Sequence, residues 1–154
     1  MKPLALAAAT AALLAGAAQA NDYAPAMQAF LDSQVRPWAE DPVIVSAIAA
    51  QNTRTGGLSQ SEIDALDQAW RAEVGAAASP TIDPVMQSAA ADFLRARVAE
   101  SGGMITEIFA VDARGLNVAA SDVTSDFWQG DEEKYSETYP VGADAVHFGE
   151  VEFD

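Results

Sequence analysis

The chain has 154 residues, with 23 acidic against 8 basic side chains, a formal net charge of −15 and no cysteine. An acidic surface of this kind repels nucleic acid and anionic lipid. Without cysteine there is no disulfide, no thiol nucleophile and no thiolate metal site. Composition therefore argues against nucleic-acid binding, excludes cysteine chemistry and leaves stability to packing.

The N-terminal residues have the pattern of a secretory signal peptide. Lys2 gives a positive start, an uncharged apolar stretch follows, and Ala18-Gln19-Ala20 matches the small-x-small cleavage pattern. We expect residues 1–20 to be removed and residues 21–154 to form one exported, periplasmic domain. This mature chain has a formal charge of 7 − 23 = −16, since only Lys2 is lost from the charged residues. No later segment is apolar over the ~20 residues that a membrane-spanning helix needs.

Helical patterns fill the first two thirds of the mature chain. Residues 22–52 carry apolar residues at helical spacing, and Pro37 is expected to break or kink that run. A second helical segment is expected to start at Asp41-Pro42, where the aspartate can cap the helix and the proline takes its first position. A Ser-x-x-Glu capping box at 59–62 opens the next helix, which Gly75 closes. A further helix is predicted over 83–101 from its apolar stripe.

Strand patterns follow the helices. Residues 105–120 predict a β-hairpin whose turn, at 112–115, ends in a glycine free to adopt positive φ. Residues 145–153 alternate apolar and polar side chains, with a shift of parity at Gly149 that predicts a bulged third strand. Helices followed by antiparallel strands indicate an α+β fold.

Three strands are few for an antiparallel sheet covered by helices, and a final strand near Phe153 would leave an open edge. We therefore expect that the C-terminal strands of the domain are missing from this sequence, or that another chain completes the sheet. The same open edge predicts association between copies of the chain.

The run "ITEIFAVDARGLNVAASDVTSDFWQGDEEKYSETY" resembles the extracytoplasmic, PAS-like sensor domains called Cache or PDC domains, in particular small periplasmic proteins built from one such domain. The helical "DPVIVSAIAAQNTR" fits the long N-terminal helix of that family. The resemblance covers most of residues 35–154. It implies a long helix and further helices packed on an antiparallel sheet, with a pocket on the sheet for a small carboxylate or amino acid. It also implies a membrane sensor or receptor protein as partner, because this chain has no signalling region of its own.

The acidic, aromatic loop at 121–139 is the predicted binding site. Aromatic residues with polar handles line small-molecule pockets, and a lone lysine among acids can anchor a ligand carboxylate or merely pair with its acidic neighbours. Trp128 is the expected pocket wall, and no cofactor is expected. The predicted ligand-binding residues are Ser121, Asp122, Asp126, Phe127, Trp128, Lys134, Tyr135 and Tyr139.

Two other functions stay open. Asp122, Asp126 and Asp131 can supply oxygen ligands for calcium, although their spacing is not that of an EF-hand, so an acidic calcium-binding or structural periplasmic protein is the alternative. A hydrolase with paired carboxylates is a weaker one. The only histidine, His147, lies in the predicted third strand, and no catalytic motif accompanies it. We therefore expect a non-catalytic, ligand-binding sensor module.

Overall fold

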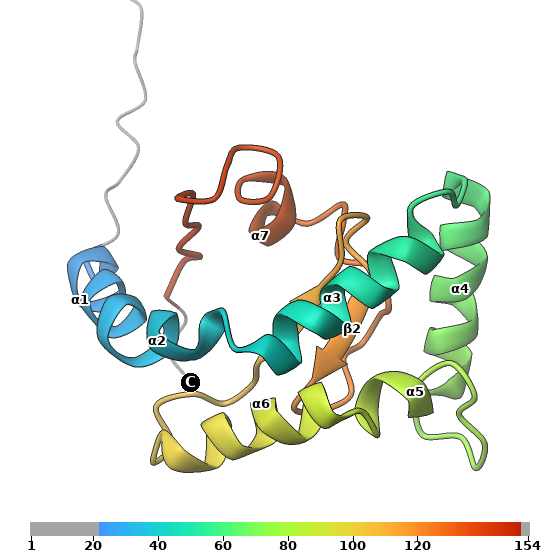
Figure 1. Ribbon diagram of the computed structural model, residues 1–154, viewed down its shortest axis with the longest axis horizontal. Coiled ribbons are helices and arrows are strands. Elements are labelled where there is room, and N and C mark those ends of the chain that lie inside the picture. The colour runs from blue at the N-terminus through green and yellow to red at the C-terminus, as the bar shows by residue number, and fades with distance from the viewer. Residues whose placement is uncertain (1–21, 152–154) are drawn as a thin grey trace, which may run out of the picture.

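The computed structural model describes residues 22–151, and the predicted signal peptide therefore lies outside the described residues (Figure 1). Helices dominate, with one β-hairpin among them. The elements in chain order are α1 (Ala24–Phe30), η1 (Leu31–Val35), α2 (Arg36–Ala39), α3 (Pro42–Thr55), α4 (Gln60–Glu73), α5 (Asp83–Met86), α6 (Ala89–Glu100), β1 (Phe109–Val111), β2 (Asn117–Ala120) and α7 (Glu133–Ser136).

Two helix starts follow directly from local sequence. The Asp41 side chain accepts a hydrogen bond from the Val43 amide at 2.9 Å, and Pro42 occupies the first turn of α3, where a missing N–H costs nothing. The predicted capping box is present at α4, where the Ser59 amide donates to Glu62 Oε2 at 2.8 Å. Both helices therefore begin where the sequence predicts.

One helix prediction is refined and a second needs correction. Of the two outcomes expected at Pro37, a break does not occur; the run continues to Ala39 and accommodates the proline through a local distortion, the π-helical turn η1. The helix predicted over 83–101 is divided at Ser88. The Ser88 hydroxyl donates to the Val85 carbonyl at 2.9 Å and accepts from the Ala91 amide at 3.0 Å, so it ends α5 and caps α6.

The predicted hairpin is confirmed. β1 pairs antiparallel with β2, with Ala110 opposite Ala119 and a bulge between Ala110 and Val111. Gly115 closes the turn with a φ of 79°, which a side chain would strain. A Cβ at Gly115 would also lie 2.6 Å from the Gly130 Cα, so the turn needs glycine for space as well as for conformation.

The prediction of a third strand over 145–153 is wrong for residues 145–151, and the last residues of that prediction lie outside the described residues. Residues 145–151 form no strand in the structure, and the sheet of the described residues has two strands. Alternating apolar residues make a strand only where a neighbouring strand offers backbone groups, and none lies beside this segment. It is tied down through His147 Nδ1, which lies 2.8 Å from Glu137 Oε2.

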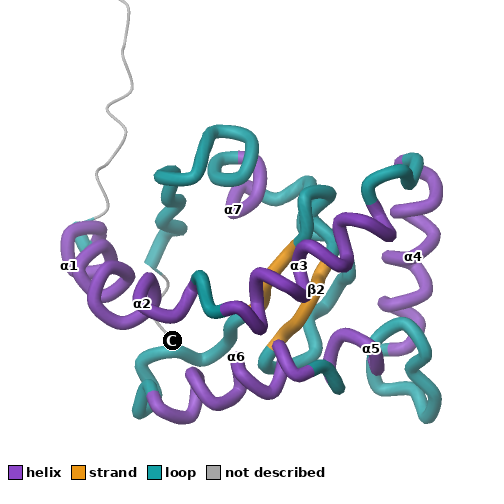
Figure 2. The backbone as a smooth tube through the Cα atoms, in the orientation of Figure 1, coloured by secondary structure: helices purple, strands orange, loops and turns teal. Residues whose placement is uncertain are grey.

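Helices α3 and α6 pack together against β2 and cover one face of the hairpin (Figures 1 and 2). That contact is built from small residues of α6 and β2 against Ile44 and Leu94. A second cluster joins α4 and α5 to the hairpin turn and the following loop, with Ile63, Trp70 and Leu116 fully buried. The fold is thus mixed helix and antiparallel sheet, as predicted.

Candidate functional site

The first half of the acidic loop is part of the core. Phe127 is buried and its ring stacks on that of Trp70, with centroids 5.2 Å apart and planes 14° from parallel. The indole of Trp70 donates to the Thr124 carbonyl at 2.8 Å, and the side-chain amide of Asn117 donates through Nδ2 to the Asp126 carbonyl at 3.0 Å. Residues 124–127 are therefore fixed by buried partners on α4 and β2.

Trp128 lies over the hairpin turn. Its indole N–H donates to the Arg114 carbonyl at 2.8 Å, its backbone forms an antiparallel bridge with Leu116, and its ring packs against the α4–α5 cluster. The ring also lies against Gly130, where an added Cβ would come within 2.3 Å of the indole nitrogen. Trp128, the predicted pocket wall, thus packs against the hairpin turn instead of lining a pocket.

A carboxylate on α4 holds this loop in place. Asp67 Oδ1 accepts hydrogen bonds from the Phe127 amide at 2.8 Å and the Trp128 amide at 3.1 Å, while Oδ2 pairs with Arg71 Nε at 2.7 Å. Burial raises the pKa of Asp67, but the hydrogen bonds from Arg71, Trp128 and Phe127 outweigh it, so the pKa is lowered overall. Arg71 also reaches Asp126 Oδ2 at 3.3 Å and links the two carboxylates.

The hairpin continues into the loop through Ser121. Its amide donates to the Ile108 carbonyl at 2.8 Å, and its hydroxyl accepts from the Ile108 amide at 2.9 Å. Asp122 is exposed and accepts from the adjacent Val123 amide at 2.7 Å. Ser121 therefore has a structural partner, and Asp122 lies at the surface.

The second half of the loop carries Lys134 on α7. Its Nζ lies 2.8 Å from Glu132 Oε2, 3.3 Å from Gln129 Oε1 and 5.2 Å from the centroid of the Phe109 ring. Gln129 is 2 % exposed, and its amide nitrogen donates to Asp126 Oδ1, which turns its oxygen toward Lys134. The ammonium is thus held above an aromatic ring by two oxygen acceptors.

Tyr135 and Tyr139 lie beside Lys134 with their rings stacked, centroids 5.5 Å apart. The Tyr135 hydroxyl donates to the Ala113 carbonyl at 2.8 Å and so fastens α7 to the hairpin turn. Burial raises the pKa of the Tyr135 phenol, with smaller contributions from the charges of Tyr139 and Asp112. Tyr139 remains 58 % exposed and forms an open side of the site.

Two adjoining cavities, of about 210 and 230 Å³, share Phe109, Gln129 and Lys134 in their lining. Asp126 lines the first, and Tyr135 and Tyr139 line the second. Ala110 packs toward α3 and α6, whereas its neighbours Phe109 and Val111 line the second cavity instead. The cavities therefore lie on the hairpin face that α3 and α6 leave open. We call them the Lys134 site.

Of the predicted residues, the structure brings four to the Lys134 site: Asp126, Lys134, Tyr135 and Tyr139. Phe127 and Trp128 point into the core and the turn instead, and Ser121 and Asp122 belong to the hairpin exit. The cavity linings therefore do not include Ser121, Asp122, Phe127 or Trp128.

Acidic residues outnumber basic ones at the Lys134 site. Among the described residues, the first cavity is lined by three acids, Glu107, Asp126 and Glu132, and by one base, Lys134. Asp126 is already paired with Arg71. Within residues 22–151, no group of three or more histidine and acidic side chains is placed to hold a metal ion. Asp122, Asp126 and Asp131 therefore do not converge as the calcium hypothesis required.

Sequence reasoning missed the partners that shape the site. Phe109 was assigned only to a strand, and Gln129, Glu107 and Asp67 were not singled out. The parity of the strand signals that Phe109 and Val111 share a face, but nothing in the sequence says which helix covers the other face. Asp67 had no signal at all, since it lies 60 residues from Phe127.

Comparison with known protein families, curated proteins and solved structures found no match for this chain. None of the helices in the described part of the chain is both long and apolar enough to cross a membrane.

Proposed function

We propose that this protein is a non-catalytic binding module for a small amino acid, held at the Lys134 site. The observation that carries the proposal is the placement of Lys134. Its ammonium lies where the two cavities meet, over Phe109, with Glu132 at 2.8 Å and further carboxylates around it. A ligand with both an ammonium and a carboxylate group matches this mixed lining, whereas a simple anion would meet more acids than bases.

The ligand carboxylate would bind Lys134 Nζ, which has two oxygen contacts on a side chain that is 47 % exposed. The ligand ammonium would then pair with Glu107, or with Glu132, whose carboxylate also contacts Lys134. Its side chain would extend along Val111 and the exposed ring of Tyr139 in the second cavity. Aromatic walls with a few placed charges are typical of small-molecule sites.

We include in the proposal that the module is a Cache-like sensor domain, exported to the periplasm, that reports ligand binding to a membrane sensor protein. The open hairpin face supports this, because the resemblance implies a ligand pocket on the sheet. The histidine of the chain, His147, pairs with Glu137 and lines neither cavity of the Lys134 site, so it offers no catalytic group there.

The test is calorimetric titration of the protein with the common amino acids, small carboxylates, amines and calcium chloride. We expect one or a few amino acids to bind, and Lys134→Gln to weaken that binding by about tenfold or more, because a charge-assisted contact is lost. Arg54→Gln is the matched control. It removes one positive charge from an exposed position on α3, away from the cavities.

Equal affinity of wild type and Lys134→Gln for every ligand that binds would overturn the proposal. Calcium binding that is lost in Asp126→Asn, with no organic ligand bound, would instead support the acidic cation-binding alternative.

A further inference from the structure

The N-terminal helical run contains a π-helical turn with an identifiable cause. Pro37 has no N–H to donate to the Ser33 carbonyl, and its ring would collide with that carbonyl in a regular α-helix. The turn widens instead, and the Arg36 amide donates to the Leu31 carbonyl five residues back. The Gln34 carbonyl accepts the indole N–H of Trp38 at 2.6 Å. Such π-helical turns occur frequently at functional sites.

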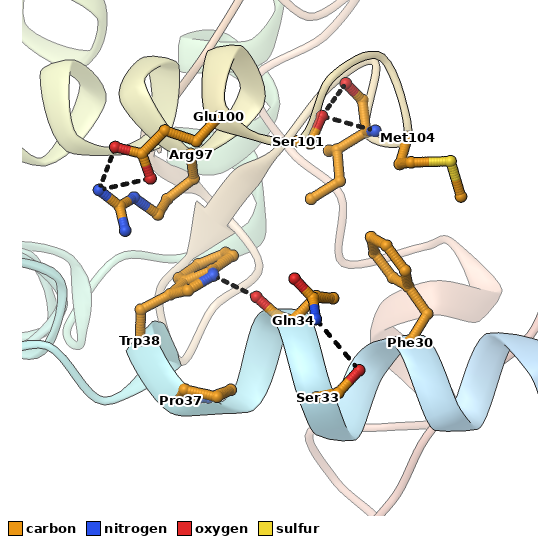
Figure 3. Close-up of a pocket in the computed structure, with 10 residues that line it drawn as sticks. Phe30, Ser33, Gln34, Pro37, Trp38, Arg97, Glu100, Ser101 and Met104 are labelled. Carbon is orange, nitrogen blue, oxygen red and sulfur yellow. Dashed lines mark hydrogen bonds and ion pairs between the residues drawn. The ribbon is translucent and has the colours of Figure 1, made fainter.

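This widened turn lines a cavity of about 630 Å³ between the N-terminal run and the end of α6 (Figure 3). The volume is within the range of small-molecule sites, about 300–1,000 Å³. Phe30, Pro37 and Trp38 form its apolar side on the N-terminal run, and Met104 and Ile105 form the opposite one. Met104 is 71 % exposed, which leaves an apolar rim in contact with water.

Among the described residues that line this cavity, one carries a positive charge. Arg97 lies with its guanidinium 5.0 Å from the centroid of the Phe93 ring, and its Nη2 pairs with Glu100 at 2.9 Å. Its Nη1 has no hydrogen-bond partner among the described residues, and its buried Nε has none either. The pairing with Glu100 is weakly held, because that carboxylate is 61 % exposed to water.

We propose that this cavity is a second binding site, which takes a small aromatic carboxylate. The ligand carboxylate pairs with the Arg97 guanidinium, whose planar fork suits carboxylate geometry, and Glu100 turns outward to water. The aromatic ring lies against Trp38, Phe30 and Met104, which offer aromatic and thioether contacts. The ligand then bridges the N-terminal run and α6, so its binding fixes the run against the domain. This site is separate from the Lys134 site and stands or falls independently of it.

The test is an NMR titration of the ¹⁵N-labelled protein with 3-phenylpropanoate, followed at the indole N–H signals. We expect a saturable shift of the Trp38 signal, assigned with Trp38→Phe, while the Trp70 and Trp128 signals stay in place. The uncharged 3-phenylpropanamide and the cationic 3-phenylpropylamine should bind about tenfold more weakly or not at all, because neither provides a carboxylate for Arg97.

Two variants separate a specific site from loss of fold. Arg97→Gln should weaken binding of 3-phenylpropanoate by about tenfold or more. Met104→Glu places a negative charge at an exposed rim position and should also weaken binding, whereas Val141→Glu makes the same change at a residue that is 70 % exposed elsewhere. Lys134→Gln should leave this binding unchanged. Equal binding of acid and amide, no saturable Trp38 shift, or wild-type affinity in both Arg97→Gln and Met104→Glu would overturn the proposal.

Discussion

Replacing Asp67 with alanine should detach the loop that shapes the Lys134 site. Asp67 Oδ1 is the acceptor for two consecutive loop amides, those of Phe127 and Trp128. Phe127 is 7 % exposed, so its amide cannot turn to water without moving the stacked ring. Asp67→Ala removes the acceptor and leaves both donors behind.

The magnitude follows from those two donors. A buried donor that loses its acceptor costs about 1–3 kcal/mol. The Asp67 side chain is 14 % exposed, so water can partly replace it and the lower end of that range applies. The Arg71 pair is half exposed and adds only about 0.5 kcal/mol. We expect a loss of about 2.5 kcal/mol in the free energy of unfolding, which lowers Tm by about 8 °C in a domain of this size.

The pH dependence gives the effect a second signature. The pKa of Asp67 is lowered from its usual value of 3.8, so the charged form is the one that folding favours. Its contribution is therefore complete above pH ~5 and is lost as the pH falls below about 4 toward the folded-state pKa. The difference in stability between wild type and Asp67→Ala should be constant from pH 7 to 5 and should shrink below pH 4.

The assay is urea unfolding at several pH values, followed by far-ultraviolet circular dichroism. Asp64→Ala is the matched control, because Asp64 lies on the same helix, is exposed and, among the described residues, accepts a side-chain hydrogen bond from Gln60 alone. An Asp67→Ala protein as stable as Asp64→Ala at pH 7 would refute the reasoning and show that the stack on Trp70 alone holds the loop.

Three further predictions follow from the structure and the sequence. Gly115→Ala should destabilise the protein by about 2 kcal/mol or more in urea unfolding, since φ is 79° and the new Cβ meets Gly130, whereas Gly57→Ala, with nothing within 4 Å, should change stability little. Trp128→Ala should cost about 2–4 kcal/mol, because the indole packs on the core and its N–H bonds the Arg114 carbonyl, and a melting temperature within 2 °C of wild type by calorimetry would contradict this. N-terminal sequencing of protein from a periplasmic fraction should find the chain starting at or near Asn21, and a chain that retains Lys2 would exclude the predicted cleavage.

The sequence by itself determined the features that depend on interactions between residues close together in the chain. The Asp41 cap, the capping box at 59–62 and the positive φ of Gly115 each depend on backbone groups within a few residues, so the printed sequence suffices to predict them. The pairing of the two hairpin strands is similarly local, because its turn sets the two strands side by side.

The tertiary structure alone decided what each residue of the acidic loop contacts. Phe127, Trp128 and Lys134 lie within eight residues of the sequence, and all three were predicted to line one ligand pocket. The direction of each side chain depends on partners far away in the chain. Trp70 and Asp67 on α4 contact residues 127 and 128 and hold them inward, whereas the Lys134 ammonium lies over the ring of Phe109 on β1. The third strand failed for the same reason, since alternation in residues 145–151 becomes a strand only where a neighbouring strand pairs with it. Contacts between distant segments are set by the packing of the whole domain, and that information is not contained in any short stretch of the sequence.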